Sequence, residues 1–400
     1  MAITVTGGPA YGLSWNKTTD AYTRVASAAG KTAGANFDTP AGGAWGSRRC
    51  NLWDDGTPTA FYGDRCYTDT DVTNMGQAMV QIPKFYYYME YDTGTTTYYW
   101  FVTTTAATTI NVGLGVGAQA VKIHPAFTRN GVVKDNIFMS AYEGYFNTTT
   151  SMLESKAGVQ PSALKTIVQF RTAAQLRAGG ITNKWEQQDY LTTCAIQLLY
   201  LIEYGGFNSQ TLLSAGITNM TDDAVHNMAS TTGHTTTLGN ASGQVLHTFD
   251  HAPDTGATTG YAMSYRGIEN IYGNIFTFVD GINIKADYDP WIANHGFVSD
   301  SFDGTVYVNS TATPLGATAG YAGDIKVDTT YDYGFLASTV TGGSATAKLC
   351  DYHAPVSGNK VMKFGGRWEY AALAGMFCWD FASILTDNSR RIGARLMYIG

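Results

Sequence analysis

The sequence contains few charged residues and few cysteines. Charged residues make up 14% of its 400 positions, a low share for an ordinary cytosolic enzyme. A net charge of −7 gives no basic face for nucleic acid or anionic lipid, so we expect no nucleic-acid partner. The five cysteines are scattered and none forms a CxxC pair, which argues against a disulfide framework and a zinc site. They are Cys50, Cys66, Cys194, Cys350 and Cys378.

The sequence also shows no long apolar run, and its first residues show no leader pattern. The first residues, MAITVTGGPAYG, contain no basic region followed by an apolar run, so we expect no secretory signal. The most apolar stretch with a helical pattern, residues 194–204, is short and carries Gln197 and Glu203. A helix of this kind cannot cross a bilayer, and we expect no membrane insertion.

Known catalytic motifs are absent as well. The sequence holds no GxSxG, P-loop, HExxH or kinase signature, which excludes the common hydrolase and nucleotide-binding patterns. The acidic pair Asp287 and Asp289 lies in DYDPW beside Pro290, a context typical of a turn. Four histidines gather at spacings of 8, 13 and 4 that match no ligand motif: His226, His234, His247 and His251. We therefore expect no catalytic residue, no metal and no cofactor, and predict that the protein is not an enzyme.

Glycine, tyrosine and threonine are abundant and favour strands and turns. The 45 glycines and 26 tyrosines accompany strand-like segments near 79–92, 95–109, 122–127 and 135–146. One helix is expected after Thr172 as N-cap, ending at Gly179 and Gly180. A second is expected over about 186–204, ending at Gly205. The polar stretches 207–260 and 286–360 are interpreted as long insertions.

Two segments far apart in the sequence carry a paired motif. The first, RGIENIYGNIFTFVD, spans residues 266–280, and the second spans residues 365–395. Together they resemble the C-type-lectin-fold proteins of phages and diversity-generating retroelements, the group that includes phage tropism determinants. The resemblance covers roughly residues 75–400. The matching positions are Arg266, Gly267, Glu269, Asn270, Gly273, Asn274, Val279, Asp280, Gly281, Gly365, Gly366, Trp368, Ala374, Gly375, Phe377, Ile392, Gly393 and Arg395.

The resemblance implies a fold and a domain organisation. We expect an α+β protein with a C-type lectin fold, in which small mixed sheets and two helices carry long loop insertions. This fold would occupy residues 71–400, after a β-rich attachment or oligomerisation segment at 1–70. Residues 265–284 and 390–399 should contribute strands to one sheet, with the helices packed against it. The frame residues should hold the fold, with Arg395 and Glu269 pairing or bonding backbone in the interior.

Between the frame residues lies an apolar insert, MFCWDFASIL, that shows no single period. In the resembled group such intervening positions are displayed outward, and exposed tyrosine, tryptophan and arginine form binding hot spots. We therefore expect Tyr370, Trp379 and Phe381 to be exposed above buried Trp368 and Phe377. The alternative is that Trp379, Phe381 and Leu385 are core. The predicted receptor-binding positions are Glu369, Tyr370, Leu373, Met376, Cys378, Trp379, Asp380, Phe381, Ala382, Ser383, Leu385, Asp387, Ser389 and Arg391.

The resemblance implies a phage tail-fibre or receptor-binding adhesin, assembled in the host cytoplasm and carried at the tail-fibre tip of the virion. Its partners would be a host-cell surface receptor, protein or glycan, and other virion tail proteins, with a homotrimer implied by the group. One alternative is a bacterial surface or secreted ligand-binding protein diversified by a retroelement.

A second alternative is an oxidase of the formylglycine-generating type, which has the same fold core. The segment GNIFTFV resembles the GNVWEW-type segment of those enzymes. That enzyme needs a reactive cysteine pair, whereas Cys350 and Cys378 lie 28 residues apart without an electropositive setting. The EPN and WND calcium motifs of sugar-binding lectins are absent, so the fold does not imply calcium-dependent lectin activity.

Overall fold

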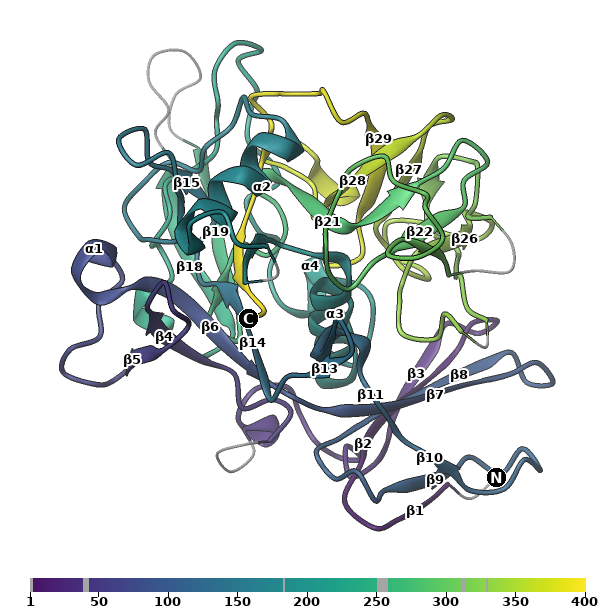
Figure 1. The fold of residues 1–400 in the computed structure, drawn as a ribbon. Coiled ribbons are helices and arrows are strands. Elements are labelled where there is room, and N and C mark those ends of the chain that lie inside the picture. Colours follow the sequence, from purple (N-terminus) through teal and green to yellow (C-terminus); the bar gives the residue numbers. More distant parts are fainter. Residues whose placement is uncertain (1–2, 39–42, 183, 250–257, 311–313, 329) are drawn as a thin grey trace.

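A computed structural model describes residues 3–38, 43–182, 184–249, 258–310, 314–328 and 330–400. Small sheets dominate, and they surround one long helix, α3 (Tyr190–Tyr204). In Figure 1, α3 lies near the centre, with the strands of three larger sheets around it. The protein is therefore strand-rich and mixed, which confirms the expected α+β class.

A five-stranded antiparallel sheet covers one side of α3. Alternate residues of a strand point to the same face of the sheet. On the face turned toward α3, Leu13, Trp15 and Trp100 join the core cluster that contains the helix. Its strands in order are β11 (Lys122–Ile123), β7 (Tyr86–Asp92), β8 (Thr97–Thr103), β2 (Tyr11–Asn16) and β3 (Ala21–Ala26). A small sheet lies beside it, formed by β1 (Thr4–Thr6), β9 (Thr109–Asn111) and β10 (Gln119–Ala120).

A six-stranded sheet pairs strands from residues 48–83 and 136–140 with the strand at residues 396–398. Its order is β17 (Trp185–Gln187), β31 (Leu396–Tyr398), β14 (Asn136–Ser140), β6 (Gln77–Pro83), β4 (Arg48–Leu52) and β5 (Pro58–Phe61). Strands before residue 70 pair with strands after it, since β4 pairs with β6 and β2 pairs with β8. The two predicted parts of the chain therefore share hydrogen-bonded sheets. The predicted attachment role of residues 1–70 stays a prediction.

An eight-stranded mixed sheet holds both motif segments. Its order is β23 (Val308–Asn309), β22 (Pro290–Ile292), β21 (Phe276–Ile284), β28 (Lys360–Phe364), β29 (Trp379–Ser383), β27 (Tyr352–Pro355) and β24 (Gly320–Tyr321), and β30 (Ile392–Gly393) pairs with β21. The β27–β29 and β21–β30 pairs are parallel. The two segments thus share one mixed sheet, as predicted. The prediction for residues 390–399 is wrong in one respect, because β31 continues into the six-stranded sheet.

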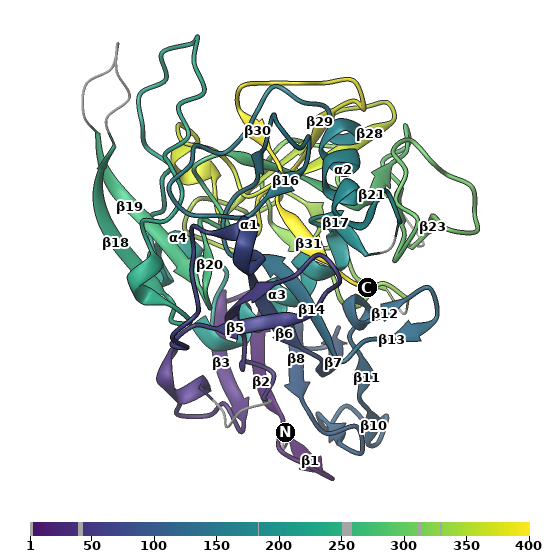
Figure 2. The same ribbon diagram turned by 60° about the vertical axis from the view of Figure 1, so that its left-hand side comes forward.

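The remaining elements are short. Part of the stretch 207–260, interpreted as a long loop or insertion, forms strand β18 of the sheet β18–β19–β20, which is seen at the left of Figure 2. The remaining strands and helices are β12 (Thr128–Arg129), β13 (Val132–Val133), β15 (Tyr145–Phe146), β16 (Leu153–Glu154), β18 (Gly243–Phe249), β19 (Thr258–Tyr265), β20 (Ile268–Glu269), β25 (Asp324–Ile325), β26 (Ala337–Thr339), α1 (Val72–Met75) and α4 (Ser209–Leu212). The 3₁₀ turns are η1 (Ala35–Phe37), η2 (Pro125–Phe127), η3 (Leu176–Ala178), η4 (Thr236–Leu238) and η5 (Ala371–Leu373).

Helix α2 (Ile167–Gln175) begins earlier than the sequence suggested. Its N-cap is Thr166, which forms a capping box with Gln169, so the prediction of Thr172 as N-cap is wrong. Thr172 lies inside the helix, where its hydroxyl donates to the Val168 carbonyl at 2.9 Å. The helix continues into η3 and ends at Gly179 in the left-handed conformation, as predicted.

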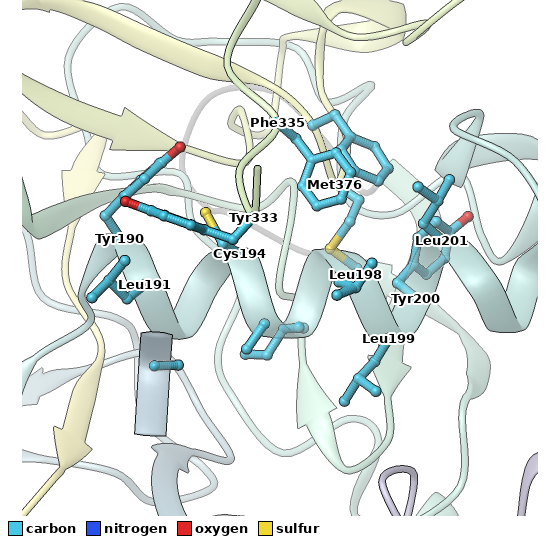
Figure 3. Close-up of a cluster of buried hydrophobic side chains, with 14 of the residues drawn as sticks. Tyr190, Leu191, Cys194, Leu198, Leu199, Tyr200, Leu201, Tyr333, Phe335 and Met376 are labelled. Carbon is cyan, nitrogen blue, oxygen red and sulfur yellow. The ribbon is translucent and has the colours of Figure 1, made fainter. Parts of the chain in front are cut away.

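Helix α3 begins later than expected and ends where predicted. Glu186 and Gln187 belong to β17 and pair with β31, so the helix starts after the N-cap Asp189 and ends at Gly205. Almost every residue of α3 is buried, which makes it the centre of the core. Figure 3 shows the apolar side chains gathered around it. None of the helices formed by described residues combines the length and apolar character that a membrane span requires.

Candidate functional site

The two motif segments form one hydrogen-bonded frame. The Gly273 amide donates to the Gly365 carbonyl at 3.0 Å, and the Trp368 amide donates to the Asn274 carbonyl at 3.0 Å. Strand β30 adds a parallel pairing with β21. Residues about 90 positions apart are therefore fixed by backbone contacts. Trp368 is fully buried, as predicted, and packs against Ile217, Met220 and Ile275.

Arg395 and Glu269 stabilise this frame through backbone groups. Arg395 is fully buried and donates to the carbonyl of Asn270 at 2.6 Å and to that of Glu269. The Glu269 carboxylate accepts from the amides of Gly233 and Thr235, each at 2.6 Å. The prediction that these residues bond backbone in the interior is confirmed.

Glu143 is a further buried acid, and no sequence pattern marks it as one. Its carboxylate accepts from Asn274 Nδ2 at 2.6 Å, and Asn274 Oδ1 accepts from the Ser230 amide at 2.7 Å. Burial raises the pKa of Glu143 to about 8. The side chain therefore links β14 and its following loop to the motif segment through a polar contact inside the core.

The frame glycines allow close approach or unusual backbone angles. Gly365 and Gly366 have φ of 91° and 81°, a region that favours glycine. A Cβ on Gly375 would lie 2.2 Å from Asp351 Oδ1, and one on Gly393 would lie 2.9 Å from the Ser162 carbonyl oxygen. Side chains at these positions would displace their neighbours.

The predicted exposure of Trp379 and Phe381 is wrong. Both lie on β29 and are 1% and 0% exposed. Along WDFAS, alternate side chains point to opposite faces, so tryptophan and phenylalanine share the face turned to the core. The Trp379 ring lies 5.3 Å from Tyr190 on α3, and the Phe381 ring lies 5.1 Å from His353. The alternative interpretation of these two residues as core is confirmed, and Phe377 is buried as expected.

Four further predicted contact residues are buried, so six of the fourteen positions are enclosed: Met376, Cys378, Trp379, Asp380, Phe381 and Ser383. Met376 lies among the core side chains over α3 (Figure 3), and its carbonyl accepts from Gln197 Nε2 at 2.7 Å. Asp380 pairs with Lys363 at 3.2 Å. The predicted outward display of these six residues is wrong because β29 and the turn before it are built into the sheet and the core.

Eight predicted positions remain partly exposed: Glu369, Tyr370, Leu373, Ala382, Leu385, Asp387, Ser389 and Arg391. Together with Arg367 and Tyr352, we call them the C-terminal surface. Except for Ala382 and Tyr352, they lie on the turn around η5 and on the loop 384–391. These are the parts of the segment that the sheet leaves uncovered.

Stacked aromatic and charged groups order the C-terminal surface. The Tyr370 ring meets Phe276 edge-on at 4.9 Å, and the Arg367 guanidinium lies 4.4 Å from the centre of the Tyr370 ring. Glu369 Oε1 accepts from Arg367 Nε at 2.9 Å and lies 3.2 Å from Arg391 Nε. Burial raises the pKa of Tyr370, which keeps its hydroxyl protonated. The surface therefore presents an anchored tyrosine among paired charges.

One apolar cluster supports several of these side chains. Tyr370, Leu385 and Tyr352 all pack against the buried group that includes Phe276 and Cys378. Tyr352 also meets Tyr321 of β24 edge-on at 6.0 Å. Sequence reasoning missed Tyr352 because it lies in the stretch 286–360 that was interpreted as an insertion. The alternation of DYHAP was the available signal.

Arg390 and Arg391 are adjacent in the sequence and turn toward the same carboxylate. Both reach Asp222: Arg390 Nη2 lies 2.6 Å from its carboxylate, and Arg391 Nη2 also donates to it. The two arginines precede β30, so strand alternation does not apply to them. They form a compact ion group at the edge of the C-terminal surface.

The thiols of Cys350 and Cys378 are both buried. Burial raises the pKa of the Cys350 thiol to about 12 and that of the Cys378 thiol well above its usual value, which disfavours the reactive thiolate. Among the residues that the structure describes, no group of three or more potential ligands could hold a metal ion. His251 lies outside those residues.

The fold was compared with known proteins. No family model matches this chain, and no curated protein matches it in sequence. The chain is similar to the solved structure "Major Tropism Determinant U1 Variant", at 12% identity over 86% of this chain and 89% of that chain, with a TM-score of 0.28. It is also similar to "Major Tropism Determinant M1 Variant", at 12% identity over 100% of this chain and 83% of that chain, with a TM-score of 0.28. Likeness at this level carries no argument about this protein.

Proposed function

We propose that this chain is a receptor-binding adhesin of a phage tail fibre, and that the C-terminal surface contacts a receptor on the host cell. The observation that carries the proposal is the contact between the two motif segments. Their shared backbone hydrogen bonds fix Trp368 in the core and leave Tyr370, Glu369 and Arg391 half-exposed above it. This arrangement agrees with the motif resemblance, in which a constant frame carries the contact residues.

The chemistry of the surface suits binding. Tyrosine and arginine are enriched among residues that dominate binding energy, and anchored aromatic rings lose little freedom on contact. Tyr370 is anchored by Phe276 and Arg367. Leu373 and Leu385 add apolar area at its side. Either a protein or a glycan receptor would find hydrogen-bonding and stacking groups here.

The finer features of the proposal extend the resemblance. Residues 71–400 would form a C-type lectin fold of the diversity-generating-retroelement type, and residues 1–70 would attach it to other virion tail proteins. The protein would act as a homotrimer at the tail-fibre tip and would not be an enzyme. The buried thiols of Cys350 and Cys378, with raised pKa values, support the last point.

The proposal is tested by binding of fluorescently labelled protein to a panel of intact bacterial cells. Arg391→Glu reverses a charge on the C-terminal surface and should lower binding to the recognised cells at least tenfold. Asp332→Asn removes an ion pair with Lys122 of β11 and should leave binding unchanged. Equal binding by all three proteins would contradict the proposed surface, and melting temperatures would show that each variant is folded.

A further inference from the structure

One part of the polar stretch 207–260 lies directly against the C-terminal surface. The Met220 amide donates to the Trp368 carbonyl at 2.7 Å, and the Ala371 amide donates to the Thr218 carbonyl at 2.6 Å. The two strands of chain thus exchange backbone hydrogen bonds in both directions. Residues 216–220 cover the turn that carries Glu369 and Tyr370.

A second contact comes from the short helix α4. Gln210 Nε2 donates to the carbonyls of Ala371 and Ala374, each at 2.7 Å. Ala371 is the first residue of η5 and Ala374 is its C-cap, so the two carbonyls lie before and after Leu373 in the turn. A single side chain therefore closes the turn from outside.

A third contact joins three segments at one carboxylate. Asp222 accepts from Arg390 Nη1 at 2.7 Å and Arg390 Nη2 at 2.6 Å, from Arg391 Nη2, and from Trp368 Nε1 at 3.1 Å. Two-point contacts between arginine and a carboxylate are among the stronger and more directional ion pairs. The hydrogen bonds from Arg390 hold the pKa of Asp222 below its usual range. Asp222 stays ionised across the physiological range.

The turn around η5 is closed by only a few internal backbone hydrogen bonds among the described residues. Within the turn, the Tyr370 amide donates to Arg367 at 3.0 Å and the Leu373 amide donates to Tyr370 at 2.9 Å. A one-turn 3₁₀ helix is too short to hold its conformation alone. Contacts from outside the turn must therefore fix the positions of Glu369, Tyr370 and Leu373.

We infer that residues 208–226 form a brace that holds the C-terminal surface in one conformation, with Asp222 as its main positioning residue. The structural part stands on the contacts above. Its role in binding rests on the proposed function: a surface fixed before contact loses less conformational entropy when it binds. Asp222 itself acts through Arg390, Arg391 and Trp368.

Hydrogen–deuterium exchange of the full chain tests the brace without any receptor. Asp222→Asn removes the charge that three donor side chains share, and it should speed exchange of the amides in 367–373 and 389–392 by about tenfold or more. The reason is that hydrogen bonds to a charged group are stronger than those between neutral groups. Gln210→Ala, on the surface of α4, should speed exchange only in 367–374. Asp222→Glu keeps the charge and should restore most of the protection.

The matched control is Asp332→Asn. Asp332 also forms an ion pair, and its side chain is 12% exposed, close to the 15% of Asp222. This control should leave exchange in 367–373 and 389–392 unchanged. Unchanged exchange there in both Asp222→Asn and Gln210→Ala would overturn the brace, as would faster exchange spread evenly over the core.

Binding to recognised bacterial cells then separates the two claims. If the exchange result holds and Asp222→Asn also binds at least tenfold less while melting at a similar temperature, the brace supports the binding surface. If exchange responds as expected but no tested variant changes binding, the brace stands and the proposed function fails.

Discussion

The two faces of β29 differ in what they can do. Trp379 and Phe381 pack into the core that contains α3, whereas Asp380 lies on the opposite face and pairs with Lys363 beside the partly exposed Ala382. The strand therefore divides its residues by alternation. The difference teaches that the sheet and the loops at its ends determine which residues of this segment a partner can reach.

The same contrast separates the frame from the surface. Frame residues such as Trp368 and Arg395 are fully buried and bonded to backbone. Surface residues such as Tyr370 and Arg391 are half-exposed and are held by side-chain contacts. Substitutions in the first group should act on stability, and those in the second on binding.

The largest loss of stability is expected when one of the two buried tryptophans, Trp368 or Trp379, is replaced. Trp379→Ala should destabilise the protein by about 3–5 kcal/mol, as much as Trp368→Ala, because both remove a large buried ring. Both rings are at most 1% exposed. Denaturant unfolding measures this directly. A loss below about 1 kcal/mol for Trp379→Ala would show that its ring is not core.

A second effect concerns the buried acid of the frame. The pKa of Glu143 is raised from 4.5 to about 8 in the folded state, so the folded protein binds the proton more tightly than the unfolded chain. The stability this proton contributes is complete below the unfolded pKa and is lost as pH rises to about 8. The free energy of unfolding should therefore fall by up to about 1.4 kcal/mol per pH unit in this window.

Glu143→Gln tests this pH dependence. The unaltered protein should lose stability relative to the variant as pH rises through the same window, because the amide has no proton to lose. Comparing the two proteins at each pH cancels contributions from other groups, including His124, whose pKa is lowered to about 3 by burial. Parallel stability curves for the two proteins would refute the assignment.

Thiol labelling compares the reaction rates of buried and exposed cysteines. Cys66 is exposed, whereas Cys350 and Cys378 are buried, and burial raises their pKa values. Iodoacetamide should therefore label Cys66 at least about 100-fold faster than either, since only the accessible thiolate reacts. Mass spectrometry of the labelled peptides measures each rate. Rapid, selective labelling of Cys350 or Cys378 would instead revive the oxidase alternative.

The smallest effect is expected on the outer side of β29. Ala382 is partly exposed, and Ala382→Ser should change stability by no more than about 0.5 kcal/mol. Its neighbour Phe381 is fully buried, and Phe381→Ala should cost about 3–5 kcal/mol. Adjacent residues of one strand thus give a matched pair. Equal losses in the two variants would contradict the assigned alternation.

Several features could be predicted from the sequence because they depend on local rules or on the paired motif. Gly205 and Gly179 end their helices, and Gly365–Gly366 turn the chain. Trp368 is core, and Arg395 bonds backbone. These residues have special conformations or large apolar area, so their environment follows from their type.

Other features depend on contacts between distant segments and could not be predicted. The short strand WDFAS was not recognised because the apolar residues Phe377 and Cys378 precede it directly and hide its alternation. Asp222 lies more than 160 residues before Arg390, and no local pattern marks it as a partner. The N-cap of α2 is a different case, because its signal is local: Thr166 and Gln169 carry the capping-box pattern, which the prediction of Thr172 overlooks.

The central claim is that the half-exposed C-terminal surface, and not the core-facing side of β29, carries binding. It is tested most directly by measuring cell binding and unfolding on Tyr370→Ala and Trp379→Ala side by side. Tyr370→Ala should lower binding to recognised cells at least tenfold, a loss typical of a hot-spot residue, and cost clearly less stability than Trp379→Ala. A Tyr370→Ala protein that binds as well as the unaltered chain would contradict the account.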